Sequence, residues 1–80
     1  MRTVTHEDVV SIAKRVTTDV DWQQIDLEEN LSEQGVDSLD MMNIIFAFQE
    51  EYGIAISDES ISMGEWRSVE RMVESLNKAL

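Results

Sequence analysis

The chain has 80 residues, the size of one domain, and its 17 acidic and six basic residues give a net charge of −11. This charge repels nucleic-acid phosphates and anionic lipids, so we expect neither a nucleic acid nor a membrane among its partners, whereas basic protein patches are attracted. Cysteine is absent, which excludes disulfides and thiol chemistry by the polypeptide itself. We expect a monomer in the reducing cytoplasm.

The N-terminal segment predicts a helix and shows no pattern of a signal peptide. Thr5 and Asp8 have the spacing of a capping box, and apolar residues then follow at helical intervals. Lys14 and Arg15 stand near the C-terminal end, where the helix dipole favours cations. We expect this helix over residues 6–18.

Residues 19–37 lack a clean period and form a long first connection. We expect Leu27 and Leu31 to lie on a short helical turn and Gly35 to adopt a backbone geometry that other residues avoid. The segment is expected to be held by its apolar side chains, which are Trp22, Ile25, Leu27, Leu31 and Val36.

A second helix is predicted from Asp37 or Ser38 to Tyr52, with Asp37 as N-cap and Gly53 as the left-handed stop. One stripe of apolar residues at helical spacing predicts its core face: Met41, Ile44, Ile45, Phe48 and Tyr52.

The same helix has a second apolar side, formed by Leu39, Met42 and Phe46. Two interpretations are open for Leu39 and Met42, which either pack against the long connection or remain exposed for a partner. For Phe46 we favour exposure and partner contact.

The last third of the chain predicts an extended connector at residues 54–56, a short helix capped by Ser57, a break at residues 63–67 and a last helix capped by Ser68. The apolar stripe of that helix is Val69, Met72, Val73, Leu76 and Leu80. The predicted fold is therefore all-α: one domain over residues 1–80, a bundle of three principal helices and one short helix.

Ser38 begins the most apolar helix, and the sequence places no base near it. The single histidine is His6, and residues 16–66 contain thirteen acids but no Lys or Arg. A serine without a neighbouring base is a poor nucleophile, so we expect no catalysis by this chain. It is suited to attachment of a group by another enzyme, although serving as an N-cap is an alternative role. The acidic clusters lack the ligand pattern of a calcium loop, so no metal site is expected.

The sequence resembles the acyl carrier proteins of fatty acid and polyketide synthesis over nearly its whole length. The resemblance rests on four segments in order: Gly35-Val36-Asp37-Ser38-Leu39-Asp40, Phe48-Gln49-Glu50-Glu51-Tyr52-Gly53, Ile54-Ala55-Ile56-Ser57-Asp58-Glu59 and Ser68-Val69. It implies that a phosphopantetheinyl transferase, using Mg²⁺, attaches 4′-phosphopantetheine from coenzyme A to Ser38. The thiol of that arm would hold acyl groups as thioesters.

The resemblance also implies partners and a docking face. The expected partners, besides the transferase, are acyltransferase or ligase enzymes and ketosynthase-type enzymes with basic docking patches. The residues expected to contact them are Asp37, Leu39, Asp40, Met42, Phe46, Glu50 and Glu51.

Departures from the family pattern favour a specialised polyketide or hybrid polyketide–peptide pathway over housekeeping fatty acid synthesis. Asn43 and Gln49 stand where glutamate is frequent, and Ser57 replaces a common proline. A peptidyl carrier is the near alternative, although Val36-Asp37 before the serine fits the acyl type better. An unmodified acidic adaptor that binds basic protein grooves is the alternative from another class.

Overall fold

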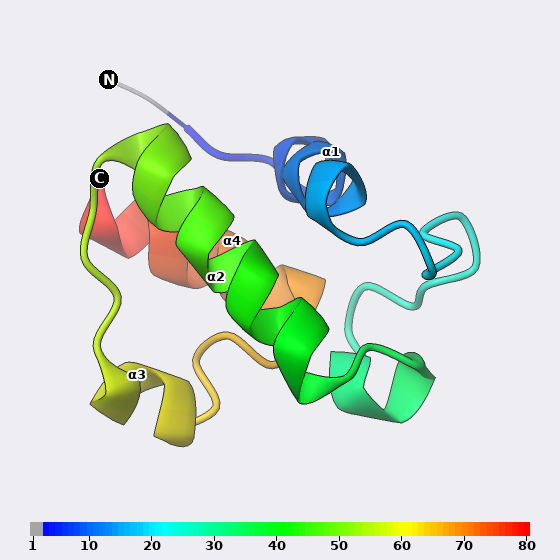
Figure 1. Ribbon diagram of the computed structural model, residues 1–80. Helices are drawn as coiled ribbons and strands as arrows, with labels where there is room; N and C mark the ends of the chain where they lie inside the picture. The colour runs from blue at the N-terminus through cyan, green and yellow to red at the C-terminus, as the bar shows by residue number, and fades with distance from the viewer. Residues whose placement is uncertain (1–2) are drawn as a thin grey trace.

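The computed structural model describes residues 3–80, which fold into the helical bundle of Figure 1. In that part of the chain the principal helices are α1 (His6–Val16), α2 (Ser38–Tyr52) and α4 (Val69–Ala79), and α3 (Asp58–Ser62) is short. A 3₁₀ turn, η1 (Leu31–Gln34), interrupts the long first connection, and the described residues contain no strand. The predicted all-α class is confirmed.

Local capping side chains fix where the helices begin. The Asp8 amide donates to Thr5 Oγ1 at 3.2 Å and the Thr5 amide donates to Asp8 Oδ2 at 3.0 Å, which completes the predicted capping box of α1. Ser57 and Ser68 likewise accept from the amides of Ser60 and Arg71 at the starts of α3 and α4. Each of these contacts satisfies a backbone donor that the first turn of a helix leaves free.

Helix α1 ends at Val16, two residues before the predicted boundary. Thr17 is buried and adopts an extended backbone, and its hydroxyl donates to the Ala13 carbonyl at 2.7 Å. The same oxygen accepts from Trp22 Nε1 at 2.8 Å. This pair of bonds turns the chain and anchors the start of the long connection.

The long connection is held by hydrogen bonds as well as by apolar contacts. Gln34 binds the main chain around it, accepting from the Asp26 amide at 2.7 Å and donating to the carbonyls of Asp26 and Glu29. Trp22, Leu31 and Val36 are buried as predicted, and Ile25 packs partly buried against the core. The expectation for Leu27 was wrong: it lies outside the 3₁₀ turn and its side chain is exposed. Its carbonyl connects this segment to α4 by accepting from the Glu70 amide at 2.9 Å.

Helix α2 crosses the front of the bundle, with α4 behind it and α1 packed against both (Figure 1). Ile44, Ile45 and Phe48 of α2 are fully buried, while Met41 and Tyr52 pack at the edge of the core. The Phe48 ring meets Trp66, from the turn between α3 and α4, with centroids 6.0 Å apart. Leu80 was expected in the stripe of the last helix, but it follows the end of α4 and is exposed.

Candidate functional site

The approach to α2 places Ser38 at the first position of that helix. Gly35 ends η1 in the left-handed conformation with φ 93°, and the buried Val36 then donates its amide to the Leu31 carbonyl at 3.2 Å. Asp37 is the N-cap, accepting from the Asp40 amide at 2.8 Å. The chain is therefore anchored immediately before Ser38, which begins a helix of 15 residues.

The Ser38 side chain is exposed, and its hydroxyl makes no hydrogen bond with the described residues. The alternative role, in which Ser38 serves as N-cap, is wrong because Asp37 performs that function. A hydroxyl on a fixed helix start that neither caps nor bonds remains available to an outside enzyme. The only histidine, His6, lies in the first turn of α1 and lines a different hollow, with Val10 and Leu27.

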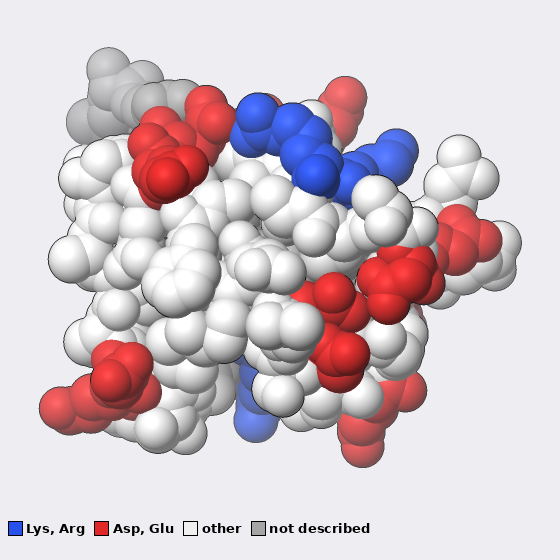
Figure 2. Space-filling model, viewed as in Figure 1, with Lys and Arg blue, Asp and Glu red and all other residues white. Residues whose placement is uncertain are grey.

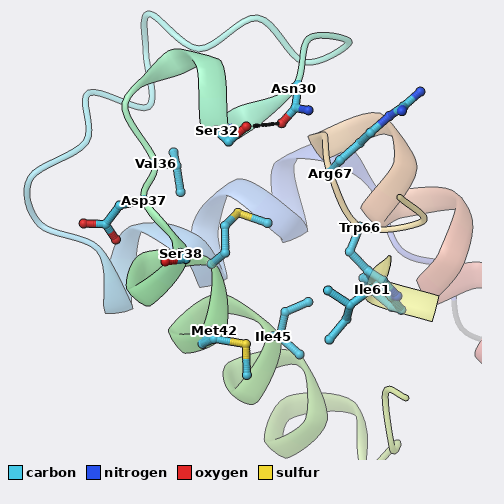
Figure 3. A pocket seen from close by; sticks show the side chains of 11 residues that line it. Asn30, Ser32, Val36, Asp37, Ser38, Met42, Ile45, Ile61, Trp66 and Arg67 are labelled. Atoms are coloured by element: carbon cyan, nitrogen blue, oxygen red, sulfur yellow. Dashed lines mark hydrogen bonds between the residues drawn. The ribbon is translucent and has the colours of Figure 1, made fainter. Parts of the chain in front are cut away.

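A partly open groove of about 380 Å³ begins beside Ser38. It lies between η1, α2, α3 and the turn before α4, and its interior side chains are apolar: Val36, Met41, Met42, Ile45, Ile61 and Trp66. In Figure 3, Ile45, Ile61 and Trp66 face one another across the groove, whereas Asp37 and Arg67 point outward. Trp66 Nε1 donates to Ser60 Oγ at 3.1 Å, which fixes the indole in the groove wall.

The second apolar side of α2 is exposed in the structure. Leu39 is 70% exposed and Phe46 54%, and Met42, 36% exposed, borders both this surface and the groove. The alternative of packing against the long connection is therefore wrong for Leu39, whereas Met42 is only partly exposed and lines the groove together with Val36 of that connection. Figure 2 shows a broad uncharged surface over α2, with acidic side chains at several places on its edge and Lys and Arg side chains along the edge toward α1.

Acidic residues stand at both ends of this surface. At the Ser38 end, partial desolvation and the nearby carboxylates of Asp19 and Asp37 raise the pKa of Asp40. Its Oδ2 is buried without a hydrogen-bond partner. At the other end Glu50 is exposed, and Glu51 forms an ion pair with Arg15 of α1 at 2.9 Å.

Sequence reasoning missed three contributors to this region. Trp66 was expected only within the break at residues 63–67, and Ile61 was given no role at the site, yet both line the groove. Arg15 was assigned to the dipole of its own helix, although its partner is 36 residues away. Gln49 stands where the family often has glutamate, and here its Oε1 accepts from the Ile56 amide at 2.8 Å, so it holds the following connector.

Within residues 3–80, no group of three or more acidic or histidine side chains is arranged to hold a metal ion. No helix of that range combines the length and apolar character needed to cross a bilayer.

The chain is thus a small helical domain with an exposed serine at the start of its longest helix, and comparison with known proteins identifies its family. The profile of the phosphopantetheine attachment site family matches residues 7–76, so the chain belongs to that family. An acyl carrier protein from Zymomonas mobilis is 45% identical over 31 residues, a segment covering 39% of this chain and 40% of the relative. No solved structure matches the chain significantly.

Family membership confirms the predicted cofactor and the predicted absence of catalysis. The family carries 4′-phosphopantetheine, and its acyl carrier members are non-catalytic. In this family the chemistry lies in the attached arm and not in the polypeptide.

Proposed function

We propose that Ser38 is the residue that carries the 4′-phosphopantetheine arm. One observation carries this assignment: the Ser38 hydroxyl is exposed at a fixed helix start, while the neighbouring Asp37 performs the capping that would otherwise occupy it. The transferase would remove the serine proton, and the oxygen would attack the phosphorus of coenzyme A that bears the pantetheine. A serine phosphodiester forms, and adenosine 3′,5′-bisphosphate leaves.

The thiol at the end of the arm supplies the thioester chemistry, which a chain without cysteine cannot supply itself. The groove beside Ser38 has an apolar interior that suits the acyl part of a cargo, since burial of apolar surface is favourable. The proposed function is thus to tether acyl intermediates and present them to biosynthetic enzymes.

The exposed side of α2 is the proposed docking face, made of Asp37, Leu39, Asp40, Met42, Phe46, Glu50 and Glu51. Its partners are the phosphopantetheinyl transferase and then acyltransferase or ligase and ketosynthase-type enzymes. Their basic patches would be steered by the acids, and the contact would be completed by the exposed apolar side chains.

We further propose a specialised polyketide or hybrid pathway in the cytoplasm. Two residues support this choice: Asn43 leaves the middle of the docking face uncharged, and Gln49 is committed to the Ile56 amide. A partner adapted to this face would meet an uncharged amide at Asn43 where the partner of a more acidic carrier would meet a glutamate.

The attachment test uses intact-protein mass spectrometry. The unmodified protein is incubated with coenzyme A, Mg²⁺ and a broad-specificity phosphopantetheinyl transferase, and we expect a mass gain of one phosphopantetheine group. Ser38→Ala should gain nothing. Ser32→Ala is the matched control, because Ser32 lines the same groove and its hydroxyl instead donates to Asn30 Oδ1 at 2.8 Å.

A mass gain that persists in Ser38→Ala would disprove the assignment. Partner binding that is unchanged in Ser38→Ala, with no mass gain in the unaltered protein, would favour the unmodified adaptor. For the pathway, the mass of the protein isolated from its own cells would name the cargo. An aminoacyl group there would make it a peptidyl carrier, and an unbranched saturated acyl series would contradict the specialised pathway.

A further inference from the structure

We propose that the ion pair between Arg15 and Glu51 neutralises one end of the docking face, so that basic partners are attracted mainly to the Ser38 end. This inference rests on the proposed function, because it concerns how enzymes approach the serine that they modify or unload. It assigns to Arg15 a role in specificity that extends beyond the packing of α1.

The geometry places the pair where a partner would meet it. Arg15 lies in the last turn of α1, and its Nη2 is 2.9 Å from Glu51 Oε1 in the last turn of α2. The side chains are 63% and 39% exposed, so both reach the surface. In Figure 2, the Lys and Arg atoms over α1 adjoin acidic atoms at the C-terminal end of α2.

The two ends of α2 differ in their cations. Within residues 3–80, Arg15–Glu51 is the only ion pair, so neither Asp37 nor Asp40 has a cationic partner there. Asp40 is further surrounded by like charge from Asp19 and Asp37. In that range the acids at the Ser38 end are therefore unpaired, with Arg67 on another wall of the groove pointing outward, whereas the other end has Glu50 and a partly neutralised Glu51.

Helix α2 is long enough for a partner to distinguish the acids at the Ser38 end from the partly neutralised Glu51 at the other. Glu51 lies fourteen positions after Asp37, which corresponds to roughly 21 Å at 1.5 Å per residue. The Debye length is about 8 Å at physiological ionic strength, so a partner senses the two ends separately. Between them lies the apolar side of α2, with Met42 and Phe46.

The partner that fits is a protein with its basic residues clustered beside its active-site entrance and an apolar socket next to them. Its surface facing the Gly53 end of α2 needs little positive charge. Approach in this orientation brings the entrance to Ser38, while the reversed orientation gains less attraction.

The experiment compares Arg15→Gln with Lys14→Gln, in the same transferase assay with coenzyme A and Mg²⁺. Lys14 is the matched control because it is the adjacent cation on α1 and forms no ion pair within residues 3–80. Both variants change the net charge equally. At about 0.15 M salt we expect Arg15→Gln to change kcat/KM about threefold relative to Lys14→Gln, the scale of one surface charge pair. The change is a decrease, because the released Glu51 carboxylate attracts the same basic surface in the reversed, unproductive orientation; an increase would overturn the inference.

The salt dependence and a second substitution test whether the change in kcat/KM is electrostatic and arises at Glu51. At about 0.01 M salt the Debye length reaches about 30 Å, so the two variants should converge, and at about 1 M both effects should disappear. Glu51→Gln should have less effect in the wild type than Asp40→Asn, and a larger effect in the Arg15→Gln background, where the carboxylate is released.

Equal kcat/KM for Arg15→Gln and Lys14→Gln at every salt concentration would overturn the inference, since net charge alone would then account for the rates. Equal effects of Glu51→Gln in both backgrounds would overturn it as well. If Arg15→Gln melts earlier than the wild type, Arg15→Met repeats the comparison with its aliphatic packing kept. Failure of the proposed function is distinguishable, because the wild type itself would then gain no arm.

Discussion

Helix α2 has two apolar sides of similar composition, of which one is buried in the core and the other is exposed. Phe48 is 0% exposed and lies against Trp66, whereas Phe46, two residues earlier on the same helix, is 54% exposed. The first side includes Ile44 and Ile45 in the core, and the second includes Leu39 and Met42 at the surface. The difference shows that hydrophobicity alone does not assign a residue to the core of a small domain, since the neighbouring helices decide which side is covered.

A side left uncovered must be explained by what it contacts outside the chain. An exposed apolar surface bordered by acids is costly for solubility unless a partner covers it. The comparison between the sides of α2 therefore separates stability, which the Phe48 side supplies, from recognition, which we assign to the Phe46 side. Substitutions on each side can break or sharpen that separation.

The largest effect is expected from Phe48→Ala. Removing a fully buried aromatic side chain leaves a cavity, so the free energy of unfolding should fall by roughly 3–5 kcal/mol. Denaturant unfolding followed by circular dichroism measures this loss. Phe46→Ala is the matched control and should change stability by less than about 0.5 kcal/mol. Similar losses in the two variants would abolish the distinction between the sides.

The next effect concerns recognition by Phe46. Phe46→Ala should lower the kcat/KM of the transferase about tenfold, the scale of removing a central aromatic anchor from an interface. Met63→Ala is a control of comparable exposure, because Met63 is 71% exposed but follows α3 instead of lying on α2. If both variants react like the wild type, the exposed side of α2 does not contact this partner.

A smaller effect is expected at the start of α2. Asp37→Ala removes the acceptor for the Asp40 amide and should cost about 1 kcal/mol of stability. Ser38→Ala should change stability by less than about 0.5 kcal/mol, since the Ser38 hydroxyl bonds to nothing in the described residues. Thermal melts of both variants measure the loss of stability. If Ser38→Ala loses as much stability as Asp37→Ala, the serine and not Asp37 alone caps the helix.

The smallest effect is a dependence of stability on pH at Asp40. The folded-state pKa of this carboxyl is raised by desolvation and by Asp19 and Asp37, so the folded protein binds a proton more readily than the unfolded chain. Stability should therefore rise as the pH falls through the raised pKa toward the ordinary pKa of an aspartate, 3.8. Asp40→Asn should flatten that part of the pH profile, and a profile identical to wild type would show that other acids cause the rise.

The helix starts could be predicted from the sequence because each depends on a contact between near neighbours. Thr5 with Asp8, Asp37 with Asp40, and Ser68 with Arg71 lie three residues apart, within the reach of one turn. The apolar stripe that includes Phe48 was equally readable from its spacing, and so was the left-handed stop at Gly53, with φ 64°. These features depend on local chemistry, so they could be predicted without knowledge of any tertiary contact.

Features that depend on distant contacts could not be predicted. The end of α1 is set by Thr17 together with Trp22, beyond the reach of a helical pattern. The groove requires Ile61 and Trp66 to approach α2 from a turn far along the chain. Arg15 and Glu51 meet across 36 residues. Residues 16–66 contain no Lys or Arg, so nothing within that segment indicates this pairing. The cation that pairs with Glu51 is Arg15, one position before the segment begins.

Trp66 connects two parts of the molecule that are usually probed separately. Its ring contacts Phe48 in the core, and the same indole forms a wall of the groove beside Ser38. Trp22, by contrast, is buried and bonded to Thr17, and it does not line the groove. The protein thus contains an intrinsic fluorophore whose emission should shift when a chain enters the groove, and a second that serves as an internal reference. Successive stages of loading could be followed optically on an unlabelled carrier.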